Sequence, residues 1–198
     1  MEFAIGDLKT DDRYKVLSAL VVPRPIAWIS TWSEDGTANC APFSFFNLVS
    51  SDPILCAIGI NRRSDGQLKD TLRNIQRTSE FVLNLVDEPM ARAMRITGHE
   101  FPPDVSEFEK AALTPTSAAR VSHPRIVQAA ASLECVVERV LEINERQHIV
   151  IAEVVYLHAR DGIIDPRTLR ISEDHYHPIG RLAGSRYCTT RDRFDLAG

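Results

Sequence analysis

The segment from Asn61 to Thr71 carries the clearest chemical signal in the sequence. It reads NRRSDGQLKDT, and a helical pattern begins within it. The first N–H groups of a helix have no intrahelical partner and, together with the helix dipole, they favour an anion. Arg62, Arg63 and Lys69 add cations that suit phosphate oxygens. The segment therefore predicts a phosphate-binding site, although a solvated helix face is the commoner origin of such a charge run.

A second stretch, residues 41–53, reads APFSFFNLVSSDP and crowds three phenylalanines among small polar residues. No simple buried strand or helix explains this mixture. Ser44, Asn47 and Ser50 supply hydrogen-bonding groups, while the aromatic rings can pack on a core or on a partner. The stretch either lines a ligand site or forms a loop whose polar side chains satisfy their own turns.

Cysteine and histidine form no recognisable metal or disulfide pattern. The four cysteines are widely separated and include no C-x-x-C pair, so we expect reduced thiols. His175 and His177 could face one side of a strand, but no cysteine or carboxylate cluster completes a set of metal ligands. We expect no metal site.

Composition argues against several classes of protein. The 198 residues are 44% hydrophobic, which suits a single domain with a buried core. The 23 basic and 27 acidic residues are mixed along the chain, which argues against a nucleic-acid partner. No apolar run approaches the roughly 20 residues of a membrane span, and the first residues do not resemble a signal peptide. We therefore expect a cytoplasmic protein without a membrane partner.

Apolar periodicity predicts the elements that must position these residues. Strands are expected at 26–32, 37–41, 53–60, 80–86, 133–143 and 148–158. The run at 53–60 suits a strand buried on both faces, and the Asp-Gly signal near residue 36 predicts a hairpin.

Helices are expected at 67–79, from Asp87 to about 96, and near 104–112. Ser64 or Asp65 is placed near the first N-cap, Asp87 as the second cap, and Glu107 in a capping box of the third.

The helices do not alternate regularly with the strands, and no G-x-G-x-x-G fingerprint is present. This order favours an antiparallel barrel with peripheral helices over a dinucleotide-binding fold. A β-sandwich remains the alternative.

Several motifs in this order resemble one known family. They are PRPIAWISTWSEDGTANCAPFSFFNLVSSDP, GINRRSDGQLKDTLRNIQRTSEFVLNLV, FPPDVSEFEKAALTP, IAEVV and RLAGSRY. The chain resembles the flavin reductase-like, FMN-binding split-barrel family from about Ser18 to Tyr187. The resemblance implies a mainly β, Greek-key split barrel and a homodimer with the flavin near the subunit interface. We expect one domain over 1–198, with a barrel core at about 18–160 and a C-terminal extension at about 161–198.

The resemblance also implies which residues bind FMN. Main chain and small side chains of the 41–53 stretch would face the flavin ring and ribityl chain, and the 61–71 segment would hold the phosphate. The cofactor-binding residues expected on this basis are Trp28, Thr31, Ala41, Pro42, Phe43, Ser44, Phe45, Asn47, Ser50, Asn61, Arg62, Lys69, Asp70 and Thr71.

Two further residues are expected to serve catalysis. His148 precedes IAEVV, where relatives often carry a histidine near the nicotinamide pocket, and it would position the nicotinamide. Arg181 opens RLAGSRY, which resembles the family's R-L-G-G-x-x-Y with Ala183 in place of a glycine. A structural histidine and a plain turn at Gly184 are the ordinary alternatives.

The function that follows is an FMN-dependent oxidoreductase of the flavin reductase type. It would take hydride from NADH or NADPH at the flavin N5 and pass two electrons to a monooxygenase or another acceptor. The alternatives are an FMN electron carrier reduced by a protein partner, and a flavin-free dimer that binds a small molecule.

Overall fold

Seven strands form one antiparallel sheet within residues 1–196, the part of the chain that the computed structural model describes. In spatial order they are β2 (Ala38–Phe43), β1 (Ala27–Trp32), β5 (Glu80–Leu85), β8 (Ala131–Asn144), β9 (Gln147–Ala159), β4 (Ile54–Asn61) and β3 (Phe46–Ser51). The two edge strands, β2 and β3, are consecutive in the chain and are joined only by Ser44 and Phe45. Because such a link spans about 10 Å at most, the sheet must curl until its edges approach. The expected mainly β barrel with peripheral helices is confirmed.

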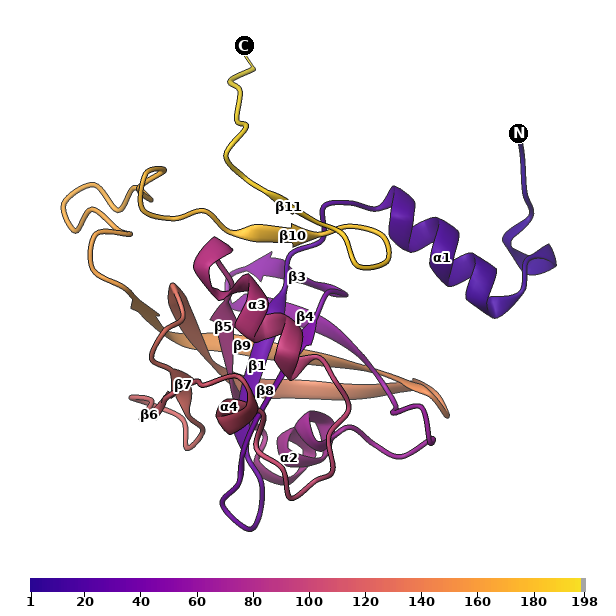
Figure 1. Cartoon of the computed structure of the whole chain (residues 1–198), viewed down its shortest axis with the longest axis horizontal. Coiled ribbons are helices and arrows are strands. Elements are labelled where there is room, and N and C mark those ends of the chain that lie inside the picture. The colour runs from indigo at the N-terminus through magenta and orange to yellow at the C-terminus, as the bar shows by residue number, and fades with distance from the viewer. Residues whose placement is uncertain (197–198) are drawn as a thin grey trace.

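The barrel interior is an apolar core that one helix closes. Alternate residues of β1, β4, β5 and β9 point inward, as the two-residue period of a strand requires. The helix α2 (Asp70–Thr78) covers one end and buries Leu72 and Ile75 in the same core (Figure 1). The start of α2, and the loop before it, are therefore fixed at the rim of the barrel.

A second core lies on the outer face of β1 and β2. Trp28 and Cys40 pack there against a layer of short elements. These are η2 (Glu88–Met90), α3 (Ala91–Thr97) and α4 (Glu107–Lys110). The Trp28 indole N–H donates to the Thr97 hydroxyl at 2.9 Å, which anchors the end of α3 beside β2.

Two expectations about strands need correction. Most of the 41–53 stretch is strand, because β2 continues to Phe43 and β3 begins at Phe46. As an edge strand, β3 leaves Asn47 exposed, so its polar residues are compatible with strand structure. The 53–60 run is not buried on both faces, since β4 alternates buried with half-buried residues around the barrel wall.

Two of the three expected helix caps are also wrong. The N-cap of α2 is Lys69 rather than Ser64 or Asp65, because the Asp65 carboxylate instead accepts the Gln67 N–H within a turn. Asp87 is at the N-cap position of η2, as expected, with Pro89 in the first turn. Its carboxylate makes no cap bond there and pairs with Arg160 at 2.8 Å instead.

The Glu107 carboxylate makes no capping box either. It turns away from its own helix and accepts hydrogen bonds from the Asn39 side chain and from the Cys40 N–H.

Several elements of the structure were not expected from the sequence. They are η1 (Ile5–Asp7), α1 (Thr10–Leu20), β6 (Pro115–Thr116), β7 (Arg125–Ile126), β10 (Ile179–Arg181) and β11 (Tyr187–Thr189). The helix α1 stands apart from the barrel and exposes Leu17 and Leu20 (Figure 1). The β10–β11 hairpin crosses above α3, in the expected C-terminal extension, whose residues 197–198 lie outside the described part.

Residues 1–196 do not meet the requirements of a membrane-spanning helix, a three-residue metal site or a disulfide. No helix in this range is long and apolar enough to cross a membrane. No group of three histidine, cysteine or carboxylate side chains within the same range is placed to hold a metal ion. All four cysteines are free thiols, and three of them are buried.

Candidate functional site

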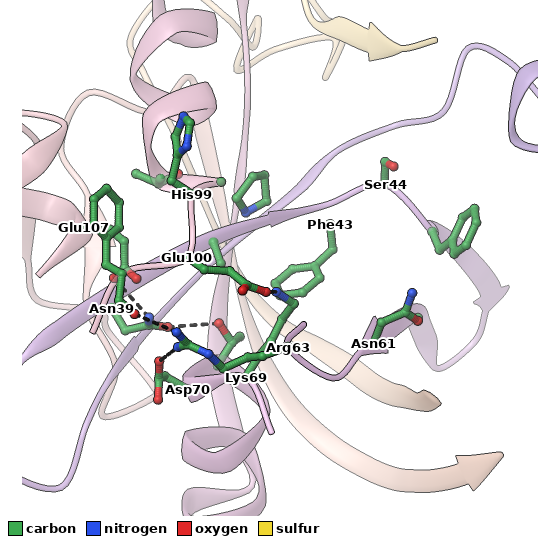
Figure 2. A pocket seen from close by; sticks show the side chains of 18 of the residues that line it. Asn39, Phe43, Ser44, Asn61, Arg63, Lys69, Asp70, His99, Glu100 and Glu107 are labelled. Atoms are coloured by element: carbon green, nitrogen blue, oxygen red, sulfur yellow. Dashed lines mark hydrogen bonds and ion pairs between the residues drawn. The ribbon is translucent and has the colours of Figure 1, made fainter. Parts of the chain in front are cut away.

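A cavity of about 270 Å³ opens where the 41–53 stretch and the 61–71 segment meet. One wall is the end of β2 and its link to β3, and the floor is the start of α2. The last residue of α3 and the loop that follows it, residues 97–101, close the opposite side. Figure 2 shows Asn39 and Glu107 on one side of this cavity and Ser44 and Asn61 on the other.

The structure brings most of the expected cofactor-binding residues together here. The ones that line the cavity are Ala41, Pro42, Phe43, Ser44, Phe45, Asn61, Lys69, Asp70 and Thr71. They come from two segments that are about 20 residues apart in the sequence and become neighbours because the barrel edges approach each other. The Gly59 N–H on β4 donates to the Phe45 carbonyl at 2.7 Å, which ties the β2–β3 link to β4 at this point.

Two expected residues lie behind the cavity wall. Trp28 is fully buried beneath α3, away from the opening. Thr31 is also fully buried, and its hydroxyl donates to the Asn39 side-chain carbonyl at 3.3 Å. Thr31 therefore supports a lining residue.

Three further expected residues point elsewhere. Asn47 and Ser50 lie on the edge strand β3, outside the lining of this cavity. The Arg62 guanidinium turns to the Gly66 carbonyl at 3.3 Å. Its neighbour Arg63 faces the cavity instead.

His148 is only 4% exposed and lies on β9 opposite Ile60. Residues two apart on a strand face the same side, so His148 shares the face of Val150 and Ala152, whose side chains belong to the barrel core. Its Nδ1 has no hydrogen-bond partner among the described residues. A role in positioning nicotinamide stays a prediction, which a His148→Ala variant tests through the KM for NADH.

Arg181 lines a second cavity that adjoins the first. Its guanidinium donates to the Tyr187 hydroxyl and to the Gly184 carbonyl, and its central carbon lies 4.7 Å from the centre of the Tyr187 ring. The RLAGSRY turn therefore fixes the direction of Arg181.

Sequence reasoning left several lining residues out. They are Tyr14, Asn39, Gly59, Thr97, Gly98, His99, Glu100, Phe101 and Glu107. Arg63, one of the cations expected to suit a phosphate, also lines the cavity. Asn39 lies in the family-like stretch, and its side chain on an otherwise apolar strand was a usable signal. Residues 97–101 have no periodic pattern of apolar residues, so no local feature of the sequence indicated that they line the cavity.

A buried polar network supports the floor of the cavity. The Asn39 side-chain carbonyl accepts from the Thr71 hydroxyl at 2.9 Å, and its amide donates to Glu107 at 3.0 Å. The Asn74 amide donates to the Thr31 hydroxyl at 3.0 Å behind them. Each bond fixes the direction of the next group, so the network orients α2 against β2.

Burial raises the pKa of the Glu107 carboxyl, and hydrogen bonds from Cys40 and Asn39 oppose this shift.

A carboxylate of the protein itself, that of Glu100, lies at one end of the cavity among hydrogen-bond donors and a cation. Glu100 accepts hydrogen bonds from the Ser64 N–H at 3.2 Å and the Ser64 hydroxyl at 2.6 Å. The Lys69 ammonium lies 3.6 Å from the same carboxylate (Figure 2). The Ser64 hydroxyl bond holds the pKa of Glu100 below its usual value, with smaller contributions from the Ser64 N–H and from Lys69.

The start of α2 adds free donors beside this carboxylate. Its N-cap, Lys69, makes no side-chain cap bond within the described chain. The first-turn N–H groups of Asp70 and Thr71, two residues that line the cavity, therefore have no capping oxygen from Lys69. Arg63 completes this end and pairs with Asp70 at 3.2 Å.

The opposite wall is closely packed. A Cβ at Gly98 would lie 3.3 Å from the Pro42 ring, so glycine lets the end of α3 pack tightly on β2 here. Pro42 and Ser44 are half-buried beside it and present main chain to the cavity. A split barrel with an anion-binding end and a narrow wall of small residues defines the class of flavin-binding split barrels.

Comparison with known proteins agrees with this class. The family model described as "Flavin reductase like domain" matches residues 19–180. An uncharacterized protein of Aquifex aeolicus is 44% identical over 187 residues, with 94% of each chain covered.

Two solved structures are similar over nearly the whole chain. One is the 2-nitrobenzoate 2-nitroreductase NbaA of Pseudomonas fluorescens, with a TM-score of 0.92 and 33% identity over 100% of this chain and 96% of that one. The other is nitrilotriacetate monooxygenase component B of Bacillus cereus, with a TM-score of 0.92 and 33% identity over 99% and 98%. The chain belongs to the flavin reductase-like family, and the expected split-barrel fold is confirmed.

Proposed function

We propose that this protein is an FMN-dependent reductase that takes hydride from NADH or NADPH. The observation that carries the proposal is the Glu100 carboxylate, which rests on Ser64 and Lys69 beside the uncapped start of α2. These donors suit the phosphate of FMN, and phosphate would take the place of the carboxylate there.

The protein's own groups divide the work of binding. Lys69, Arg63 and the first-turn N–H groups of α2 would hold the phosphate, and the main chain from Ala41 to Phe45 would face the ring. Asn39 and Glu107 keep α2 and β2 in place beneath it. Bound FMN supplies two-electron chemistry at its N5, which needs no side-chain base. The chain contributes position and exclusion of water.

The similar proteins favour a reductase over an electron carrier. At 33% identity, one is named a nitroreductase and the other a monooxygenase component. A monooxygenase or another acceptor is therefore the proposed destination of the electrons. An FMN electron carrier, reduced by a protein, is the second candidate, and a flavin-free dimer is the third.

We also propose a homodimer. The helix α1 leaves Leu17 and Leu20 exposed, and the edge strand β3 exposes Leu48 and Val49. A helix that packs so little against its own barrel gains stability by packing on a second copy. Tyr14 on α1 lines the cavity, so such a contact would also shape the site.

Anaerobic reduction tests the function directly. The FMN-loaded protein is mixed with NADH or NADPH while the visible flavin band is followed. Rapid bleaching supports the reductase, and a band that persists favours the electron carrier. Failure to bind FMN at all overturns the proposal.

A further inference from the structure

The second cavity, of about 220 Å³, adjoins the proposed FMN site. Both cavities are lined by Pro42, Phe43 and Ser44, and Gly98 and Tyr14 also face both. A molecule in the second cavity would therefore touch the same wall as the proposed flavin ring. This is where a second ligand of the reductase would lie.

The charges of the two cavities differ. In the first, both cations are paired, Arg63 with Asp70 and Lys69 with Glu100. The second is lined by Arg95 and Arg181, and no carboxylate belongs to its described lining.

Within residues 1–196 neither Arg95 nor Arg181 lies within 4 Å of a carboxylate oxygen. The 7%-exposed Arg24 donates at 3.4 Å to the Ser44 hydroxyl behind the wall, and it too lacks a carboxylate partner in this range. Uncompensated positive charge is therefore concentrated around this cavity, where it favours an anion.

Arg181 is held ready to bind that anion. A guanidinium has five N–H groups, and Tyr187 and Gly184 accept only two of those of Arg181. Its stacking on the Tyr187 ring fixes the remaining donors in one plane. A planar carboxylate matches such a fork with two parallel hydrogen bonds. Arg95 projects from α3 and adds a second, less restrained cation.

The rest of the lining suits an aromatic ring of limited size. Tyr14, Phe43 and Tyr187 surround the two guanidiniums. Ring faces and edges favour another ring at offset or perpendicular contact. This cavity is smaller than the adjoining proposed FMN cavity, which suits a ligand with one ring and one acid group.

We propose that this cavity binds a small aromatic carboxylate, with its acid group on Arg181 and Arg95 and its ring beside the 42–44 wall. The inference rests on the proposed function in one respect, since it identifies this acid as the second ligand of the reductase. Binding of the acid itself depends only on the cavity, and it can be measured without FMN turnover.

Calorimetric titration with benzoate and its neutral analogue benzamide tests the proposal, with FMN-loaded protein at low ionic strength. We expect benzoate to bind at least tenfold more tightly than benzamide. Arg95→Gln and Arg181→Gln should each weaken benzoate binding about tenfold, the loss of one charge-assisted contact, and leave the Kd for FMN unchanged. Arg92→Gln is the matched control, because Arg92 is an exposed residue of α3 outside this lining.

Equal binding of the two probes overturns the proposal, and so does an equal loss in the Arg92 and Arg95 variants. A higher KM for NADH in the Arg95 variant, with benzoate binding unchanged, also overturns it, because the anion is then a nucleotide phosphate. If Arg181→Gln fails to fold, Arg95→Glu replaces it and should abolish benzoate binding. If the protein does not bind FMN, the proposed function fails while the same titration of the apoprotein still decides the anion site.

Discussion

Lys69 and Glu100 form one ion pair, yet replacing the two residues should change FMN affinity in opposite directions. Lys69→Gln removes a cation that the phosphate would use, and Glu100→Gln removes the carboxylate that occupies the phosphate's place. A pair that served only to hold the loop would give losses in both variants.

The structure sets the sizes of the two effects. A charge-assisted contact to phosphate contributes about 1.5–3 kcal/mol, so Lys69→Gln should weaken FMN binding by roughly 10- to 100-fold. The Lys69–Glu100 pair is partly exposed, with its atoms 3.6 Å apart, and pairs of this kind contribute about 0.2–1 kcal/mol. Glu100→Gln should therefore tighten FMN binding by no more than about fivefold.

Quenching of FMN fluorescence during titration of the apoprotein measures both effects. Lys110→Gln is the control, because Lys110 is an exposed lysine outside the cavity lining and its loss should leave the Kd unchanged. Weaker binding in the Glu100 variant, or unchanged binding in the Lys69 variant, would refute the phosphate assignment.

Three further predictions concern stability. Burial lowers the pKa of His123 to about 4, below its usual 6.5, so the free energy of unfolding should fall by about 3 kcal/mol as pH drops from 6.5 to 4. Urea unfolding of the wild type and of the His123→Gln variant measures this, and the variant should lose that part of the pH dependence. The buried Glu134 carboxylate accepts three backbone N–H groups of one loop, so Glu134→Gln should cost about 1.5–3 kcal/mol in thermal unfolding, and an unchanged Tm would contradict it. A Cβ at Gly180 would lie 2.6 Å from the Pro23 Cβ, so Gly180→Ala should destabilise the fold by about 1–3 kcal/mol, whereas Gly6→Ala, which meets open space, should not.

Sequence patterns predicted the barrel strands well because their signal is local. Strands β1, β5 and β9 follow apolar runs whose alternation faces one core. The helix α1 was missed because its apolar residues form no single face. It buries only Ser18, and its Tyr14 ring lies 5.9 Å from that of Phe45. The edge strand β3 was obscured by polar residues, which an edge position tolerates.

The site was predicted in part because some of its residues lie in contiguous segments with a local pattern. The contiguous 41–45 and 61–71 segments carry their own pattern, and ten of their residues line the cavity. Glu100 reaches it from a loop and Glu107 from α4, both distant in sequence, so only the folded chain reveals them. Arg62 and Arg63 are adjacent and alike in sequence, and the turn before α2 alone decides that Arg63 faces the cavity.

Titration of the apoprotein with FMN and with riboflavin tests the central claim most directly, because the two flavins differ only in the phosphate. We expect FMN to bind at least tenfold more tightly than riboflavin, and Lys69→Gln to remove most of this difference. Equal affinities for FMN and riboflavin would contradict the assignment of the α2 end of the cavity to the flavin phosphate.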